Sequence, residues 1–262
     1  MERKGISVFL RVRNEEKTLR LALLSSMYIS DQIVVVDNCS KDNSFEIAQE
    51  FKKEFSLENM VVEKFEYDPQ ERESTLADLY NYTVSFTTGK WLVKWDGDCY
   101  CEEENCRLIR NSIDKYEDNK NVDGLYLSNR IIYKGFEKVS KNLGTEMGIF
   151  RYHKGLTYVA YQKGLQVVGQ KLYNQEKYFL ADDLLEKPIW HIRLKTSEEL
   201  VRSRFILHFY RQNPDCSLEE FIERNKEGRT FEQIENEMFL NDIELYNEHK
   251  HGKIPEEILS LK

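Results

Sequence analysis

The sequence predicts an α/β fold with a mostly parallel central sheet flanked by helices. Up to about residue 100, short apolar runs alternate with helical segments, and this alternation is typical of βαβ units. The run QIVVVD (32–37) carries β-branched residues at consecutive positions, as expected of a strand that helices cover on both faces. Because βαβ crossovers are right-handed, we expect a doubly wound sheet.

The expected elements follow one another with short connections. ISVFLRV (6–12) has the apolar composition of a buried strand, and Leu19, Ala22 and Leu23 recur at helical spacing between residues 15 and 27. Turn residues at 40–44 lead into the expected helix 45–55, and Thr87-Thr88-Gly89 end the expected helix 75–86. In order, the remaining expected elements are the strand 32–37, the helix 45–55, the strand 61–67, the helix 75–86 and the strand 90–96.

After about residue 120 the α/β alternation stops. Residues 124–139 hold two apolar runs around Lys134-Gly135 and predict a hairpin, and residues 149–161 predict further short strands. We assign residues 1–195 to one α/β domain.

The remainder, residues 196–262, is expected to be a helical extension packed on that domain. Thr196 to Glu199 and Ser217 to Glu220 both match the capping box, in which a hydroxyl caps a helix and a glutamate follows three residues later. A late helix is expected to present an apolar face made by Phe231, Ile234, Met238 and Leu245.

Composition excludes several classes of protein. The net charge of −8 argues against a nucleic-acid binder, which needs a basic surface. The apolar runs are far shorter than the ~20 residues of a membrane span, and the N-terminus lacks the apolar core of a signal peptide. An odd count of five cysteines favours free thiols in a reducing compartment. We expect a cytoplasmic protein, for which peripheral contact with the inner face of the membrane stays open.

Polar side chains follow two of the expected strands. Asp37 and Asn38 follow IVVV, and Asp96 and Asp98 follow WLVKW with Gly97 between them. In open α/β sheets, ligands bind outside the carboxyl ends of the strands. Two adjacent carboxylates repel each other unless a cation lies between them, and carboxylate oxygens suit Mg²⁺ or Mn²⁺. A metal that bridges the protein to a nucleotide is therefore expected at this edge.

The successive motifs ISVFLRVRNEEKTL, QIVVVDNCSKDNS and NYTVSFTTGKWLVKWDGD resemble those of family 2 glycosyltransferases of the GT-A fold. The resemblance covers roughly residues 5 to 105, and a weaker echo in EMGIFRYHKGLTY and PIWHIR is similar to bacterial members that extend cell-surface glycans. It implies transfer of a hexosyl or N-acetylhexosaminyl group from a nucleoside diphosphate sugar, with a UDP-sugar favoured, in polysaccharide biosynthesis.

The resemblance also implies residue roles. Asp37 and Asn38 match the positions that contact the nucleotide base, and Asp96 the acid near the ribose and the metal. Asp98 matches the principal metal ligand, and His191 a late histidine near the metal or diphosphate. Asn38 stands where many members carry aspartate, which weakens the implied selectivity for uridine.

The catalytic base departs from the family pattern, because Tyr-Gln-Lys-Gly (161–164) stands where related enzymes carry an acid. An inverting transferase needs a carboxylate to accept the proton of the acceptor hydroxyl. We favour Asp182 or Asp183 for this role, although the pair also fits the start of an exposed helix. The other acids available are Glu146, Glu176 and Glu186.

Basic residues offer further contacts to the donor. Arg11 and Arg13 leave the first strand toward the same edge, where a guanidinium fork matches phosphate geometry. A surface position beside Glu15 and Glu16 explains them equally well. A second basic sector would bind the diphosphate or an anionic acceptor, or be a solvated helix face. It comprises Arg193, Lys195, Arg202, Arg204 and Arg211.

The sequence thus predicts a metal-dependent glycosyltransferase, expected to be inverting, with a glycan or lipid-linked glycan as acceptor. One rival is a phosphatase of the haloacid dehalogenase type, which also places D-x-D after a strand. Another is a nucleotide-sugar-binding protein that has lost its base. Cys99, Cys101 and Cys106 raise a zinc site as a further alternative, but their spacing lacks a second ligand pair, and thiols that fill the core are the favoured interpretation.

Overall fold

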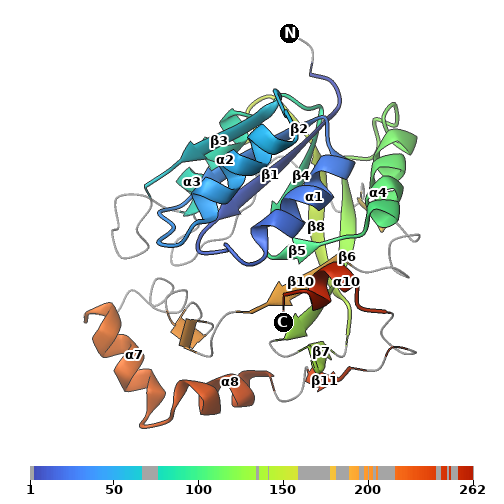
Figure 1. The fold of residues 1–262 in the computed structure, drawn as a ribbon. Helices are drawn as coiled ribbons and strands as arrows, with labels where there is room; N and C mark the ends of the chain where they lie inside the picture. Colours follow the sequence, from blue (N-terminus) through green and yellow to red (C-terminus); the bar gives the residue numbers. More distant parts are fainter. Residues whose placement is uncertain are drawn as a thin grey trace.

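The computed structural model shows one large sheet with helices on both faces (Figure 1). It describes residues 3–66, 76–133, 136–140, 142–158, 178–180, 189–194, 198–199, 201–202, 205, 216–239, 243–246, 248 and 253–261. Within that part of the chain, none of the helices has the length and apolarity that a bilayer span requires.

The N-terminal half of the sheet is parallel. Its strands lie in the order β3-β2-β1-β4. The chain adds β2 and β3 on one side of β1 and then crosses to add β4 on the other side. This register places Arg11 opposite Asp96 and Val12 opposite Asp37, so the carboxyl ends of three strands meet at one edge. The strands are β1 (Ile6–Val12), β2 (Gln32–Asp37), β3 (Met60–Lys64) and β4 (Trp91–Asp96).

Helices cover both faces of this parallel half, as the consecutive β-branched residues predict. Val8 and Leu10 of β1 pack into one core with three of the helices, whereas Phe9 packs into a second core on the opposite face with α3. The expected doubly wound architecture is therefore confirmed. The helices of the first face are α1 (Leu19–Ile29), α2 (Ser44–Glu54) and α4 (Glu103–Lys115), and α3 (Leu76–Ser85) covers the second.

The sheet continues beyond β4 with mixed directions. Strand β8 lies antiparallel between β4 and β6, and β6 forms the expected hairpin with β7. Strand β10 is parallel to β6 and antiparallel to the short β5. The pairing with β5 places Tyr100, just after β4, opposite Trp190, which is 90 residues later in the chain. These strands are β5 (Cys99–Tyr100), β6 (Gly124–Tyr133), β7 (Lys138–Ser140), β8 (Gly144–Arg151), β9 (Tyr178–Leu180) and β10 (Ile189–Arg193).

Two expectations for the later chain are wrong in part. Residues 152–158 continue as turn and coil, because β8 ends at Arg151 where its pairing with β4 ends. Leu245 is not on a helix: it belongs to β11 (Ile243–Leu245), which pairs with the outer edge of β7. An open strand edge offers backbone hydrogen bonds that the helical spacing of apolar residues does not reveal.

The C-terminal helices are α7 (Leu218–Lys226), α8 (Phe231–Phe239) and α10 (Glu256–Leu259). The capping box at the start of α7 is confirmed, since Ser217 Oγ accepts from the Glu220 amide and the Glu220 carboxylate accepts from the Ser217 amide. Ile258 of α10 packs with Ile132 and Trp190 in a third core, so this C-terminal helix covers strands β6 and β10.

Candidate active site

Charged and polar residues stand where β1, β2 and β4 end. These strand ends lie at the lower edge of the parallel sheet in Figure 1. Asp37 is the last residue of β2, and Asp96 is the last residue of β4. Because these strands flank β1 on either side, the polar ends face each other across it. This is the edge at which open α/β sheets bind ligands.

Asp96 lies among cations. Its carboxylate accepts from the Arg11 guanidinium at 3.5 Å and lies 3.9 Å from the Lys94 ammonium. The Arg11 guanidinium also stacks on the Tyr80 ring of α3, 3.5 Å from its centroid. Lys94 was not among the residues predicted from the sequence, although its spacing of two from Asp96 on a strand places both side chains on the same face.

Asp98 makes a different contact. Its Oδ2 lies 3.0 Å from Nε2 of His191, and the Ile192 amide donates to its backbone oxygen at 2.7 Å, so the turn after β4 is held against β10. Both side chains are largely buried, with 11% of Asp98 and 21% of His191 exposed. Burial by itself lowers the pKa of His191, but the charges of Asp98 and Asp96 and the hydrogen bond to Asp98 outweigh it, so this pKa is raised.

Donor atoms for a metal lie together here. One oxygen of Asp98, the Cys99 sulfur and a ring nitrogen of His191 all lie within 4.8 Å of one another. Of the predicted ligands, the structure thus brings Asp98 and His191 together, while Asp96 is outside this group although its charge acts on His191. Carboxylate, imidazole and thiolate are the donors that divalent cations take in proteins, so these residues fit a metal.

Asp37 and Asn38 are almost fully buried at the end of β2, with 2% and 6% exposed. Asp37 Oδ1 accepts from the Ser40 amide at 3.1 Å. Its other oxygen and Asn38 Oδ1 have no hydrogen-bond partner among the described residues. A buried acceptor without a donor costs free energy, so both atoms suit a ligand that supplies N–H groups.

Residues 7–178 match the model of the family described as glycosyl transferase family 2, which is more than half of the chain. The chain belongs to glycosyltransferase family 2. It is an enzyme of the glycosyltransferase class with the GT-A fold. No curated protein matches its sequence.

Solved structures of similar fold include a mannosyltransferase of Pyrobaculum calidifontis in complex with GDP-Man and Mn²⁺, at 12% identity and a TM-score of 0.50 over 85% of this chain and 69% of the other. TarS 1–349 of S. aureus in complex with UDP-GlcNAc is 15% identical, with a TM-score of 0.48 over 85% of this chain and 73% of the other. At such identities the similarity concerns the fold alone.

The other residues predicted for this glycosyltransferase are less informative. Arg13 is half-buried just after β1, without an ion pair to any described residue. Asp182 and Asp183, the predicted base, lie outside the described residues, as do Lys195, Arg204 and Arg211 of the basic sector. Arg202 pairs with Glu198 and Glu219, and Arg193 lies 5.8 Å from the Tyr133 ring.

Gly97 of the transferase lies close to the Glu15 side chain and does not have a positive φ. A Cβ at this position would lie 3.1 Å from Cγ of Glu15, and Gly97 is not among the glycines with positive φ. The turn between Asp96 and Asp98 therefore does not require the left-handed backbone conformation that favours glycine.

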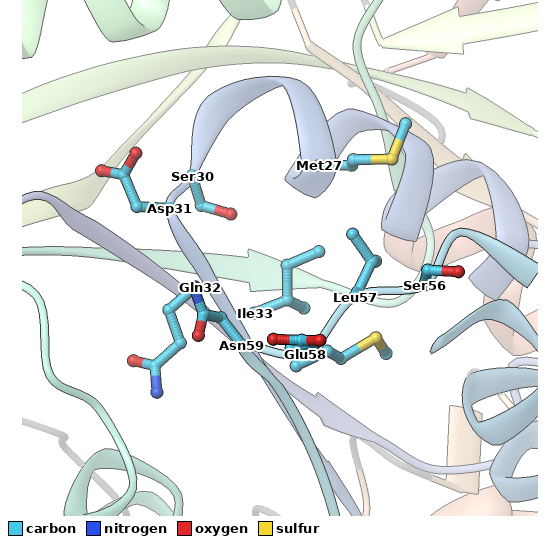
Figure 2. Close-up of a pocket in the computed structure, with 10 residues that line it drawn as sticks. Met27, Ser30, Asp31, Gln32, Ile33, Ser56, Leu57, Glu58 and Asn59 are labelled. Atoms are coloured by element: carbon cyan, nitrogen blue, oxygen red, sulfur yellow. The ribbon is translucent and has the colours of Figure 1, made fainter. Parts of the chain in front are cut away.

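Two cavities of the transferase lie at opposite edges of its sheet. The cavity in Figure 2, about 320 Å³, is lined by Gln32 and Ile33 at the start of β2 and by Met60 at the start of β3, so it lies at the amino ends of these strands. A cavity of about 400 Å³ at the carboxyl edge is lined by residues 14–18, Lys41 and Asp42 together with Ile192 and Leu194. Of these two, the second lies beside the polar strand ends, and a smaller cavity there is lined by Lys94, Asp96 and Cys99.

Proposed function

We propose that the chain is a metal-dependent, inverting glycosyltransferase that moves a hexosyl or N-acetylhexosaminyl group from a UDP-sugar to a hydroxyl of a glycan or lipid-linked glycan. The observation that supports this best is the Asp98–His191 pair at the carboxyl edge of the sheet. It lies beside Asp96, which forms ion pairs with Arg11 and Lys94. A transferase of this family needs a donor site at that edge, and the pair supplies metal ligands there.

Asp37 and Asn38 bind the base of the donor in this proposal. Their buried oxygens, which lack donors among the described residues, would accept from the imide N–H of uracil. Arg11 is held between Tyr80 and Asp96, so its guanidinium is positioned before the donor arrives. Arg11 and Arg13 then bind phosphate oxygens, which match the guanidinium fork.

Asp98 and His191 would hold a Mn²⁺ or Mg²⁺ ion, with Asp96 near the ribose and the ion. Such a cation, when bound, supplies positive charge that stabilises the departing diphosphate. His191 must lose its proton to act as a ligand through Nε2, and the metal would then replace the present hydrogen bond between Nε2 and Asp98 Oδ2. Lys94 adds a positive charge on the Asp96 side.

Asp182 or Asp183 is proposed as the base that accepts the proton of the acceptor hydroxyl as that hydroxyl attacks the sugar carbon. Attack from the face opposite the diphosphate inverts the configuration. The proposal also retains a catalytic domain over residues 1–195 with an extension over 196–262, and a cytoplasmic enzyme that meets its acceptor at or near the membrane.

A donor panel tests this function. UDP-, GDP-, CMP- and dTDP-sugars are each added to the full chain with Mn²⁺, with Mg²⁺ or with chelator, and the melting temperature is recorded. We expect a selective rise with a UDP-sugar that needs the metal, followed by product formation when glycan acceptors are supplied. Stabilisation without turnover across the acceptors would favour an inactive sugar-nucleotide-binding protein instead.

Product analysis tests the mechanism separately. Nuclear magnetic resonance of the first product is expected to show the anomeric configuration opposite to that of the donor. Retention would refute the inverting assignment. Hydrolysis of a simple phosphoester without nucleotide-sugar binding would revive the phosphatase alternative, which the family membership leaves without support.

A further inference from the structure

Cys99 faces the same site as the two metal ligands. In the antiparallel pair of β5 with β10, Cys99 is directly opposite His191. Side chains of directly opposite residues lie on the same face of a sheet with their Cβ atoms about 5 Å apart. Cys99 is therefore fixed beside the imidazole by backbone pairing, and Asp98 precedes it in the chain.

The strand that carries Cys99 is anchored on both sides. The indole Nε1 of Trp95 donates to the Cys99 backbone oxygen at 3.1 Å, and the Ile192 amide donates to the Asp98 backbone oxygen at 2.7 Å. These bonds tie the segment to β4 and to β10. The position of the sulfur relative to His191 thus follows from regular structure and not from a loop.

The distances suit one small cation. Donor atoms bound to the same ion at about 2.0–2.3 Å lie about 3–3.8 Å from one another. Asp98 Oδ2 and His191 Nε2 already lie 3.0 Å apart, and the sulfur is within 4.8 Å of both. A side-chain movement of about 1 Å would bring all three donors into range.

The other cysteines of the cluster do not share this position. Cys101 and Cys106 are buried in the core that β1 forms with α1 and α4, and the Cys106 thiol donates to the Cys101 backbone oxygen. The three-cysteine zinc site that the spacing raised is therefore not what the fold builds from these residues. Although Cys99 packs in the same core as Cys101 and Cys106, it is the cysteine whose sulfur lies with a carboxylate and an imidazole among the described residues.

We propose that Cys99 is a third protein ligand of the metal site, which makes the site selective for borderline divalent cations such as Co²⁺ and Zn²⁺ over Mg²⁺. This inference rests on the metal site of the proposed function. Thiolate sulfur favours these softer cations, whereas carboxylate and water suffice for Mg²⁺. On binding, the sulfur–metal bond forms as the thiol S–H bond breaks, and the proton passes to solvent.

The charge balance has a consequence for the donor. With one carboxylate and one thiolate, a divalent cation is neutral at the site, whereas without the thiolate it keeps one positive charge. Three protein ligands still leave an open position for an oxygen of the diphosphate, as catalytic zinc sites do. The neighbouring cations Arg11 and Lys94 then matter more for holding the diphosphate charge.

Cobalt titration tests the inference with a spectrum rather than with activity. Co²⁺ is added to the reduced full chain, and the near-ultraviolet absorption band of thiolate-to-cobalt charge transfer is followed, with proton release measured in parallel. We expect the band in the native chain and in Cys216→Ser, whose thiol is far from this cluster in the sequence, and its loss in Cys99→Ser.

Affinities sharpen the test, because even sites without sulfur prefer Co²⁺ to Mg²⁺. Cys99→Ser is expected to weaken Co²⁺ binding at least about 10-fold, the loss typical of removing even an outer-shell partner, with a much smaller effect on Mg²⁺. Cys99→Asp keeps a harder ligand, so it is expected to bind Mg²⁺ better than Cys99→Ser does, without the band. Circular dichroism checks that each variant is folded.

Co²⁺ binding without the band, or with equal affinity in Cys99→Ser, overturns the role of Cys99 and leaves the metal site of the proposed function intact. Absence of binding for Co²⁺, Mn²⁺ and Mg²⁺ alike, with and without UDP, overturns both. The two failures are therefore distinguishable by whether calorimetry detects a bound cation.

Discussion

The two sides of the active site are built in different ways and carry different charge. On the parallel side, Asp96 is neutralised by Arg11 and Lys94 from neighbouring positions of β1 and β4. On the antiparallel side, Asp98 meets His191 and Cys99 through the pairing of β5 with β10. Although one residue separates the two aspartates, the first is paired with an arginine and a lysine, and the second is paired with a histidine, a side chain that can itself bind a metal.

This difference assigns unequal roles to the two acids of the D-x-D motif. A carboxylate that holds an arginine in place helps to position a phosphate-binding group, whereas a carboxylate beside an imidazole provides a ligand set. The comparison predicts that substitutions on the antiparallel side remove metal dependence, whereas those on the parallel side weaken nucleotide binding and leave metal binding in place.

The largest effect is expected from Asp98→Ala. Loss of a principal ligand should lower metal-dependent turnover by about 100-fold or more, as loss of a group that stabilises transition-state charge does. Calorimetry should show that Mn²⁺ no longer enhances UDP binding. The matched control is Asp123→Ala. Asp123 forms a similar pair, in which its Oδ1 lies 3.2 Å from Nε2 of His153, and neither residue belongs to the proposed site. Equal losses in both variants would contradict the assignment.

A smaller effect is expected from Asp37→Ala on the parallel side. The variant loses a charged acceptor for the base, which is worth about 1.5–3 kcal/mol, so UDP affinity should fall about 10- to 150-fold. Co²⁺ affinity in the absence of nucleotide should stay unchanged, and both are measured by calorimetry. Cys39→Ser, at an exposed neighbouring position, serves as the control. A loss of metal binding in Asp37→Ala would break the distinction between the two sides.

Arg11 and Lys94 allow a graded test within the parallel side. Arg11→Met removes both the contact to Asp96 and the stacking on Tyr80, whereas Lys94→Met removes a longer ion pair of 3.9 Å. We expect UDP affinity to fall about 10-fold in the first, because charge-assisted bonds are worth about 1.5 kcal/mol or more, and by less in the second. The reverse order would show that Lys94, not Arg11, contacts the diphosphate.

The smallest effect is expected from Gly97→Ala, at the residue that joins the two sides. A Cβ there meets the flexible side chain of Glu15 at 3.1 Å, which can move, so the free energy of unfolding should fall by less than about 1 kcal/mol. Gly89→Ala is the contrasting control, because its Cβ would meet the backbone of Ser7 and Trp91. Urea denaturation compares them, and equal destabilisation would show that the turn at Gly97 is rigid.

The strand ends were predictable from local patterns. The runs 6–12, 32–37 and 90–96 correspond to β1, β2 and β4, so the sequence alone places Asp37 and Asp96 at a shared edge. Strand composition and connection length decide such features, and both are local in the sequence. The C-terminal strand β11 was missed because its partner edge on β7 lies about 100 residues earlier.

The sequence alone determined the doubly wound α/β core, its family resemblance and the acids at the strand ends, because periodicity and short motifs record local structure directly. Only the tertiary structure decided that Asp96 faces Arg11 and Lys94 while Asp98 faces His191, and that the sulfur of Cys99, not of Cys101 or Cys106, lies within 4.8 Å of donor atoms of Asp98 and His191. The physical reason is strand register: pairing β5 with β10 brings residues 90 positions apart side by side, and a shift by one residue would turn every side chain to the other face.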